Sequence, residues 1–281
     1  MKNYLLLGIS LFCSITFAQV RTPQSSPKAK ISQVVGMTDF TIEYARPSKR
    51  GRAIVGNLIR FGELWRTGAN KNTTIEFSDT IMIKGKEIPS GKYAIYTLPN
   101  ENSWVLYFYS RTDSWGVPKE WEESKIALSI TLPVERIDKE VETFTIDISD
   151  IKSSGANINL SWENTLISLP VEVPSVKQAM LSIEKTLSNN PKAGDYYNAA
   201  VYYLNEGHDL NQAKTWISKA VEMQDDAFWM FRQQSLILAG LNETSAAIAA
   251  AKKSLALAIK AGNKDYEIMN NESIEKWSNW Y

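Results

Sequence analysis

The segment Ala213-Lys214-Thr215-Trp216-Ile217-Ser218-Lys219-Ala220 carries small residues at both ends and bulky apolar residues between them. Small residues recur at the same point 34 positions earlier and 34 positions later, at Ala179 and Ala247. A fixed period of this length is typical of stacked helix pairs, in which each pair buries its apolar face against the next. The spacing therefore predicts that the last third of the chain is a helical repeat.

Helical spacing begins at Ser175, a capping residue that follows Pro174, and continues towards the end of the chain. Apolar residues then recur on one face of each successive segment, and turn residues such as Asn190-Pro191 and Gly207-His208 separate the segments. The pattern predicts helices over residues 176–187, 199–204, 213–221, 228–239, 246–259 and 265–280.

This helical part resembles tetratricopeptide repeats, whose second helix carries a small residue, a bulky one, a second small one and then a proline at fixed offsets. Three sets of residues match that pattern: Ala179, Ile183, Thr186 and Pro191; Ala213, Ile217 and Ala220, with Asp225 in place of proline; and Ala247, Ala251 and Ser254, where Ala251 is small and a bulky residue is usual. The resemblance covers residues 175–281 and implies a surface for a protein partner. An ordinary pair of packed helices is the alternative.

Between Lys28 and about Val173 the pattern has period two, as in Phe40-Thr41-Ile42-Glu43-Tyr44. Alternation of this kind, with turn residues between the segments, predicts many short antiparallel strands and hence a β-sandwich. We expect strands over residues 40–44, 73–77, 81–83, 93–98, 104–109, 126–132, 144–148, 158–162 and 166–171. The fold class is therefore α+β, with a β-sandwich at residues 19–173 and a helical domain at residues 174–281.

The most distinctive strings of the β domain are Arg46-Pro47, Gly51-Arg52 and Trp65-Arg66-Thr67-Gly68-Ala69-Asn70, with Ser26-Pro27-Lys28 before them and Gly91-Lys92-Tyr93 after. With these strings, about residues 25–170 resemble a bacterial exported family catalogued as domain of unknown function 2911. The resemblance implies a β-rich exported domain that helices often follow. It implies no reaction and no catalytic residues.

The first 18 residues read as a signal peptide. Lys2 precedes an apolar run at residues 4–17, and Thr16-Phe17-Ala18 predicts cleavage before Gln19. An uncleaved anchor is the alternative reading. Cys13 is the only cysteine, so the mature protein would have no thiol chemistry, and we expect it to be periplasmic or secreted with no membrane span.

Charge and composition exclude several classes of function. The chain has 31 basic and 31 acidic residues, which disfavours a nucleic-acid partner. Its one histidine, His208, leaves no Ser–His–Asp set and no histidine metal cluster. We therefore expect no cofactor and no metal, and a binding or scaffolding protein more than an enzyme.

Residues 46–66 hold a local excess of positive charge, with six cations and one anion, Glu63. The planar guanidinium group of arginine suits carboxylate, phosphate and sulfate groups. One hypothesis is a pocket for a small anionic molecule or a glycan, built from Arg46, Arg52, Arg66 and Asn70 with Trp65 as a stacking platform. The alternative is that these arginines pair with acidic residues and only hold the loops in place.

A second group, Trp104, Tyr109, Trp115 and Trp121, suits either sugar stacking or core packing, and core packing is the commoner case. A competing hypothesis is a cell-envelope enzyme that acts on a glycan through carboxylates such as Glu63, Glu76 or Glu120. The leading interpretation is a non-catalytic module that binds a protein partner through its helical repeats.

Overall fold

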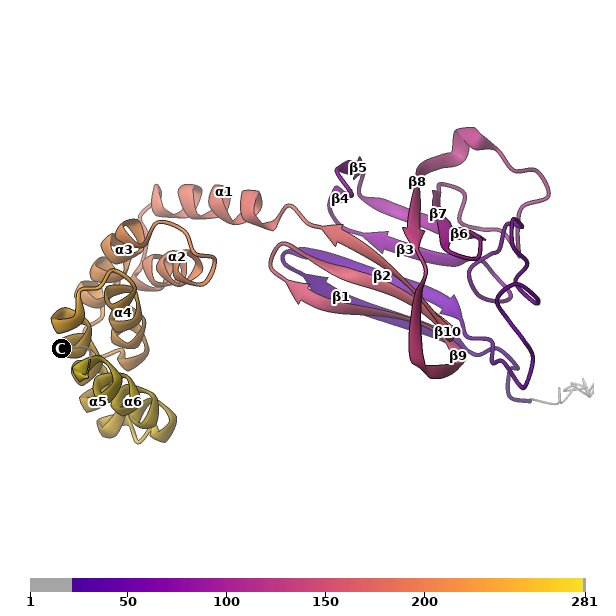
Figure 1. The fold of residues 1–281 in the computed structure, drawn as a ribbon. Coiled ribbons are helices and arrows are strands. Elements are labelled where there is room, and N and C mark those ends of the chain that lie inside the picture. The colour runs from indigo at the N-terminus through magenta and orange to yellow at the C-terminus, as the bar shows by residue number, and fades with distance from the viewer. Residues whose placement is uncertain (1–21, 280–281) are drawn as a thin grey trace, which may run out of the picture. The chain divides into compact units, whose positions relative to one another are not determined.

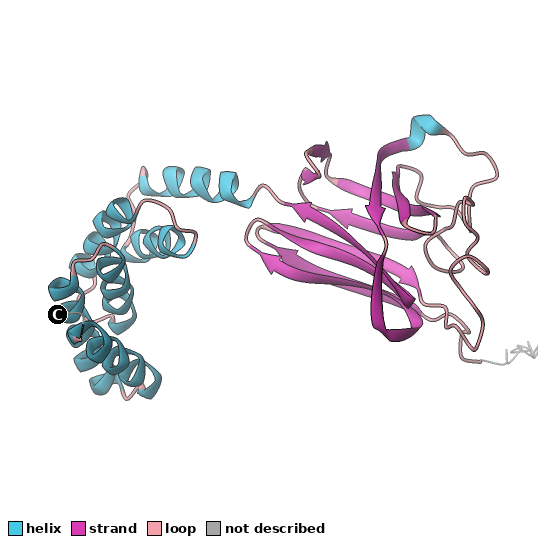
Figure 2. Cartoon of the chain, viewed as in Figure 1, coloured by secondary structure: helices cyan, strands magenta, loops and turns pink. Residues whose placement is uncertain are grey.

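A computed structural model describes residues 22–279, so the expected signal peptide at residues 1–18 lies outside the described part. The chain divides into two compact units, Met1–Pro174 and Ser175–Tyr281. Figures 1 and 2 show that the described part of the first unit is built from strands and loops with one short helical turn, and the second from α-helices. The prediction of a segregated α+β chain is confirmed.

The β unit contains two antiparallel sheets. One sheet has six strands, in the order β1 (Lys28–Val35), β2 (Thr38–Ala45), β3 (Thr73–Phe77), β6 (Gly91–Pro99), β7 (Ser103–Tyr109) and β8 (Ile126–Pro133). The other has four strands, in the order β5 (Lys86–Ile88), β4 (Ile81–Ile83), β10 (Gly155–Glu172) and β9 (Glu135–Lys152). A short 3-10 turn, η1 (Glu123–Lys125), precedes β8.

The core of this unit lies between the inward faces of the two sheets. In β2 every second residue is buried, including Phe40, Ile42 and Tyr44, as the period-two pattern predicts. These side chains belong to one cluster with residues of the four-stranded sheet such as Phe144 and Leu160. Burial between two sheets is what stabilises this unit.

Two long strands differ from the prediction. Residues 158–162 and 166–171 belong to the single strand β10, because the polar break between them is a bulge at Glu163, where the register shifts and φ is +51°. Its partner β9 has 18 residues, although only residues 144–148 were expected. The first half of β9 is mostly exposed and charged, so the apolar alternation that marks a half-buried strand is missing there.

The helical unit consists, within the described residues, of α1 (Ser175–Leu187), α2 (Ala193–Asn205), α3 (Leu210–Met223), α4 (Phe228–Gly240), α5 (Thr244–Ala261) and α6 (Lys264–Ser278). The side chains of Ala213, Ala220, Ala247, Ala251 and Ser254 have no exposed surface, so the periodic small residues lie where helices pack. In residues 22–279 no helix is both long enough and apolar enough to cross a bilayer.

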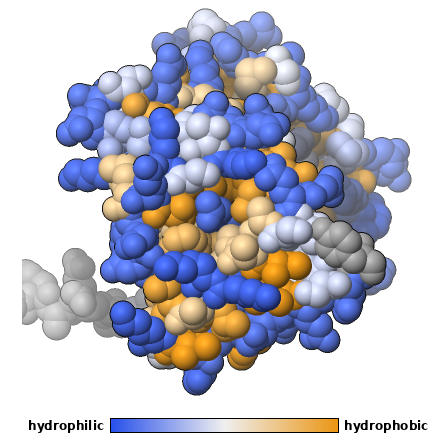
Figure 3. Space-filling view, turned by 90° about the vertical axis from the view of Figure 1, so that its left-hand side faces the viewer, coloured by the Kyte–Doolittle hydropathy of each residue, from blue (hydrophilic) through white to orange (hydrophobic). Residues whose placement is uncertain are grey.

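Several large apolar side chains of the helical unit are exposed. The face shown in Figure 3 has patches of hydrophobic residues among hydrophilic ones. The exposed large hydrophobic residues in the helices are Val176, Leu181, Met223, Ile259 and Ile268. Scattered exposed apolar residues are normal on a protein surface, so they do not define a site by themselves.

Candidate functional site

The residues predicted to form a site lie in the loop between β2 and β3, and one acid from β10 anchors this loop. The two carboxylate oxygens of Glu163 accept hydrogen bonds from the backbone N–H groups of Ile54 and Val55, each at 3.0 Å. Glu163 occupies the β10 bulge described above. A bulge re-aims a side chain, and here it directs a carboxylate at a loop 109 residues earlier in the sequence.

Arg46 holds the same loop against β9. Its Nε donates to the carbonyl oxygen of Phe144 at 3.1 Å, and its Nη2 donates to the hydroxyl of Thr145 at 2.7 Å. The Phe144 N–H in turn donates to the carbonyl oxygen of Pro47 at 2.9 Å. These bonds engage the guanidinium group of Arg46 with β9, and they give the residue a structural role.

Three of the five predicted residues, Arg52, Trp65 and Arg66, line one cavity of about 350 Å³, which we call the arginine cavity. Arg50 lines it as well. The side chain of Arg52 is oriented by the backbone, because Nε donates to the carbonyl of Lys49 at 2.9 Å and Nη2 to that of Ser48 at 2.7 Å. The half-buried Arg66 makes no hydrogen bond or ion pair with any residue in the described range 22–279.

Trp65 forms part of the wall of this cavity. Its ring stacks on Trp162 with centroids 5.9 Å apart and an interplanar angle of 22°. Trp104 and Phe144 meet the same ring at steep angles, 86° and 71°. Because Trp162 covers one face of Trp65, the ring is mainly part of the sandwich core and offers a ligand less surface than a free platform would.

The turn that follows Arg66 is conformationally strained. Thr67, Gly68 and Asn70 all have positive φ, at 53°, 143° and 62°. Thr67 is fully buried, and its carbonyl oxygen accepts a short hydrogen bond from the hydroxyl of Thr73. A β-branched residue with positive φ persists only where its surroundings enforce it, and such strain is concentrated at functional sites.

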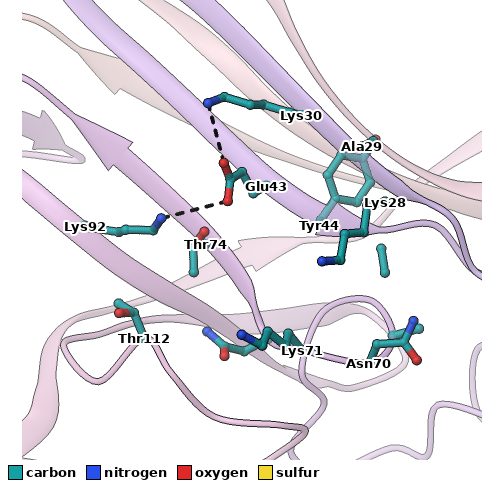
Figure 4. A pocket seen from close by; sticks show the side chains of 13 residues that line it. Lys28, Ala29, Lys30, Glu43, Tyr44, Asn70, Lys71, Thr74, Lys92 and Thr112 are labelled. Atoms are coloured by element: carbon teal, nitrogen blue, oxygen red, sulfur yellow. Dashed lines mark ion pairs between the residues drawn. The ribbon is translucent and has the colours of Figure 1, made fainter. Parts of the chain in front are cut away.

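A second cavity, of about 530 Å³, lies on the solvent face of the six-stranded sheet, and Ala69 of the strained turn lines both cavities. We call it the lysine cavity, because it is lined by Lys28, Lys30, Lys71 and Lys92 with one acid, Glu43. Figure 4 shows the ammonium groups of Lys28 and Lys92 pointing towards the space beside the loop that carries Asn70 and Lys71.

Asn70, the remaining predicted residue, lines the lysine cavity and not the arginine cavity. Its amide nitrogen donates a long hydrogen bond, 3.5 Å, to the carbonyl oxygen of Ser26. Sequence reasoning missed the lysine cavity as a whole. Lys28 and Lys30 stand two apart in β1 and so share one face of the sheet, which was the available signal.

Most acidic partners in this region belong to other cations. Lys49 forms ion pairs with Glu140 and Glu163, and the hydrogen bond to Glu140 raises the pKa of the Lys49 ammonium above its ordinary value. Arg60 pairs with Glu63 at 3.4 Å. Within the described part of the chain, no carboxylate lies within ion-pair distance of Arg46, Arg52 or Arg66. Their partners are backbone and hydroxyl groups, or none.

The aromatic group is split by the structure. Trp104 is only 2% exposed in the sandwich core, and Trp121 stacks on Tyr109 with centroids 4.5 Å apart. Trp115, by contrast, is 70% exposed. The ring contacts of Trp104, Tyr109 and Trp121 are those of core packing.

The carboxylates considered for catalysis are not gathered at the cavities. Glu63, Glu76 and Glu120 line neither the arginine cavity nor the lysine cavity. Among residues 22–279 no group of three or more His, Cys, Asp and Glu side chains is arranged to hold a metal ion. What the described cavities offer chemically is positive charge and hydrogen-bond donors.

Comparison with known proteins identifies a family, and the matching solved structures include a distant one. The model of a family described as "Protein of unknown function (DUF2911)" matches residues 26–171. The solution structure of protein BPP2914 from Bordetella parapertussis, a structural genomics target, is similar over 38% of this chain and 88% of that chain, with 13% identity and a TM-score of 0.31. A TM-score this low does not establish a shared fold. No curated protein matches the chain.

Proposed function

The chain belongs to the DUF2911 family of proteins of unknown function, and we propose that it is a non-catalytic binding protein whose β unit binds an anionic group in the arginine cavity. One observation carries this proposal. Arg66 lines the cavity beside Arg50 and Arg52, and no hydrogen bond or ion pair within the described residues occupies its guanidinium group. A carboxylate, phosphate or sulfate would complete the site.

The neighbouring residues favour this use of Arg66. Because Arg52 is fixed by two backbone carbonyls, it presents positive charge without a large loss of side-chain entropy on binding. Guanidinium groups bind carboxylate and phosphate through paired hydrogen bonds, and these charge-assisted bonds are stronger than neutral ones. The strained turn at Thr67 and Gly68 directly follows Arg66 and keeps its backbone in place.

Calorimetric titration of the mature protein with citrate, at low and at high sodium chloride concentration, tests the proposal. We expect salt-sensitive binding that Arg66→Ala weakens about 10- to 100-fold, as expected for the loss of a charge-assisted pair. Arg66→Lys would restore only part of the affinity, because an ammonium group lacks the planar fork. Arg60→Ala is the matched control, since Arg60 is exposed and already paired with Glu63.

Two results would contradict the proposal: an unchanged affinity in Arg66→Ala, or an equal loss in Arg60→Ala. Turnover of an acidic polysaccharide by the purified protein would favour the enzyme hypothesis instead. In that case a single Glu→Gln change at Glu63, Glu76 or Glu120 should abolish activity and leave the fold intact.

A second function is proposed for the helical unit, namely binding of a protein partner by a tetratricopeptide-like stack. The observation that favours it is the complete burial of the small residues Ala213 and Ala247, which stand one 34-residue period apart and allow close helix packing. Crosslinking of the full chain in its own cell envelope tests this function. Crosslinks that cluster on the helices would support it, and their absence would count against it.

Export is the third element of the proposal, because the basic and apolar start of the sequence has the form of a signal peptide. Export would place the anion site in the periplasm or outside the cell. N-terminal sequencing of the protein recovered from its native envelope should read from Gln19. A start at Met1 in a cytoplasmic fraction would contradict it.

A further inference from the structure

The lysine cavity contains a buried amide group with no partner. Asn72 lines the cavity and is only 5% exposed. Neither its Nδ2 nor its Oδ1 makes a hydrogen bond with any residue of the described chain. Buried amides are nearly always hydrogen-bonded, because an unsatisfied buried polar group costs folding free energy. The Asn72 amide therefore keeps a donor and an acceptor that no other described residue satisfies, in a residue that lines this cavity.

The rim that carries this amide is firmly built. The Asn72 N–H donates to the carbonyl oxygen of Ser114 at 3.2 Å, and the Gly116 N–H donates to that of Asn70 at 3.1 Å. Lys71 and Trp115 form an isolated β-bridge between these two bonds. Pairing with a second loop thus fixes the backbone around Asn72. The Asn72 side chain is therefore attached to a constrained segment.

Charge in the lysine cavity is unbalanced. Glu43 is shared between Lys30 at 3.5 Å and Lys92 at 3.9 Å, and Figure 4 draws both pairs. Lys28 and Lys71 have no ion pair within the described residues, so the cavity keeps an excess of positive charge. Like charges on one concave surface repel each other and attract an anion.

We propose that the lysine cavity binds a sugar that carries a carboxylate, such as a uronic acid unit of an acidic glycan. Lys28 and Lys71 meet the carboxylate, and the Asn72 amide, acting as both donor and acceptor, meets ring hydroxyls. Asn70, Thr74 and Thr112 supply further neutral hydrogen-bonding groups around the same space. A volume of about 530 Å³ lies within the range of pockets that enclose a small organic ligand.

This chemistry distinguishes a sugar acid from a bare anion. A sulfate ion would satisfy the lysines, but it carries no proton at neutral pH and would leave the buried Asn72 carbonyl oxygen without a donor. A neutral sugar would satisfy Asn72 but would leave Lys28 and Lys71 unpaired. Only a ligand with both features uses the whole cavity. The lysine cavity and the arginine cavity share only Ala69 among their lining residues. Binding of a sugar acid in the lysine cavity can therefore be tested independently of the proposed function.

The test is an NMR titration of the full mature protein with D-galacturonate, D-galactose and inorganic sulfate. The reporter is the side-chain NH₂ signal of Asn72, identified by its loss in Asn72→Ala. We expect galacturonate to shift this signal at concentrations where galactose and sulfate do not. The double variant Lys28→Ala/Lys71→Ala should weaken galacturonate binding about tenfold, the effect of removing two exposed charge contacts.

Controls separate this site from its alternatives. Lys86→Ala removes an exposed lysine in β5 outside the cavity and should not alter the galacturonate titration. Asn72→Ala should lose binding without losing stability, because the amide makes no bond in the fold. The proposal is overturned if galacturonate leaves the Asn72 signal in place, or if sulfate or galactose shifts it equally.

Discussion

Tyr44 and Ile146 exchange two hydrogen bonds: the Tyr44 hydroxyl donates to the carbonyl oxygen of Ile146 at 3.1 Å and accepts from its N–H at 2.9 Å. Tyr44 belongs to β2 of the six-stranded sheet, and Ile146 belongs to β9, an edge strand of the four-stranded sheet. Both residues are buried. One phenol thus satisfies the backbone groups of an edge strand that no further strand covers.

Replacement of this hydroxyl tests the link between the sheets. Tyr44→Phe leaves a buried N–H and a buried carbonyl without partners, and we expect it to lower the free energy of unfolding by about 1–3 kcal/mol. Urea unfolding followed by tryptophan fluorescence measures this. Tyr107→Phe is the control, because Tyr107 is only half-buried. An equal effect in both variants would mean that the hydroxyl of Tyr44 has no special role.

Arg46 and Arg66 should respond oppositely to removal. Arg46→Ala breaks two hydrogen bonds to β9 and should cost about 1–3 kcal/mol of stability, while folded protein keeps its citrate affinity. Arg66→Ala should lose citrate affinity with little change in stability, since Arg66 makes no bond in the described structure. Urea unfolding measures the stability of each variant, and calorimetric titration measures its citrate affinity. Loss of binding in Arg46→Ala would place that residue in the site after all.

Gly68 is required by both its conformation and its surroundings. Its φ is +143°, and an added Cβ would stand 3.0 Å from the carbonyl oxygen of Ala45 and 3.1 Å from the hydroxyl of Thr73. We expect Gly68→Ala to destabilise the β unit by at least about 1–3 kcal/mol. Gly62→Ala is a useful comparison, since Gly62 also has positive φ but no neighbour within 4 Å. Similar losses in the two variants would show that strain, and not crowding, dominates.

Buried tyrosines predict a loss of stability in alkali. Burial raises the pKa of Tyr96 and also that of Tyr93 above the ordinary value of 10.0. Above about pH 10 the unfolded chain releases these protons while the folded chain retains them, so the free energy of unfolding falls as pH rises. Urea unfolding between neutral pH and pH 11 measures the slope, which Tyr96→Phe should reduce. An unchanged slope in that variant would contradict the assignment.

The small repeat positions of the helical unit leave no room for larger side chains. Ala213 has no exposed surface, so Ala213→Leu should overpack the helix interface and cost about 1–3 kcal/mol. Ala261→Leu, at the exposed end of α5, should have little effect. Thermal unfolding followed by the helical circular dichroism signal compares them. Tolerance of leucine at Ala213 would argue against close packing at the repeated alanines.

The local pattern of apolar and polar residues predicted most of the fold, because a half-buried strand or helix has a characteristic apolar period. The helix from Phe228 begins where apolar residues take up helical spacing, and the strand from Thr73 begins where period-two alternation starts. The strands β1 and β5, the exposed half of β9 and the continuity of β10 through Glu163 were not predicted. In β1, in β5 and in the exposed half of β9 at most one residue is fully buried, so the apolar alternation that marks a strand is weak there.

The site was harder to predict, because residue type does not reveal what a side chain contacts. Arg46, Arg52 and Arg66 are chemically alike in the sequence. In the structure, Arg46 is hydrogen-bonded to β9 and Arg52 to the local backbone, whereas Arg66 has no hydrogen bond within the described residues. The lysine cavity depends on the register of β1 against β2 and on the pairing of Asn72 with Ser114. Such long-range pairings are set by the tertiary fold.

The bonds from Glu163 to Ile54 and Val55 have a consequence for how the protein is made. A loop that depends on a carboxylate 109 residues downstream cannot take its final form until that part of the chain has left the ribosome. The high contact order of this anchor should make completion of the arginine cavity one of the last and slowest steps in maturation. A protein truncated before β10 would thus retain every arginine of the site and still lack the site itself.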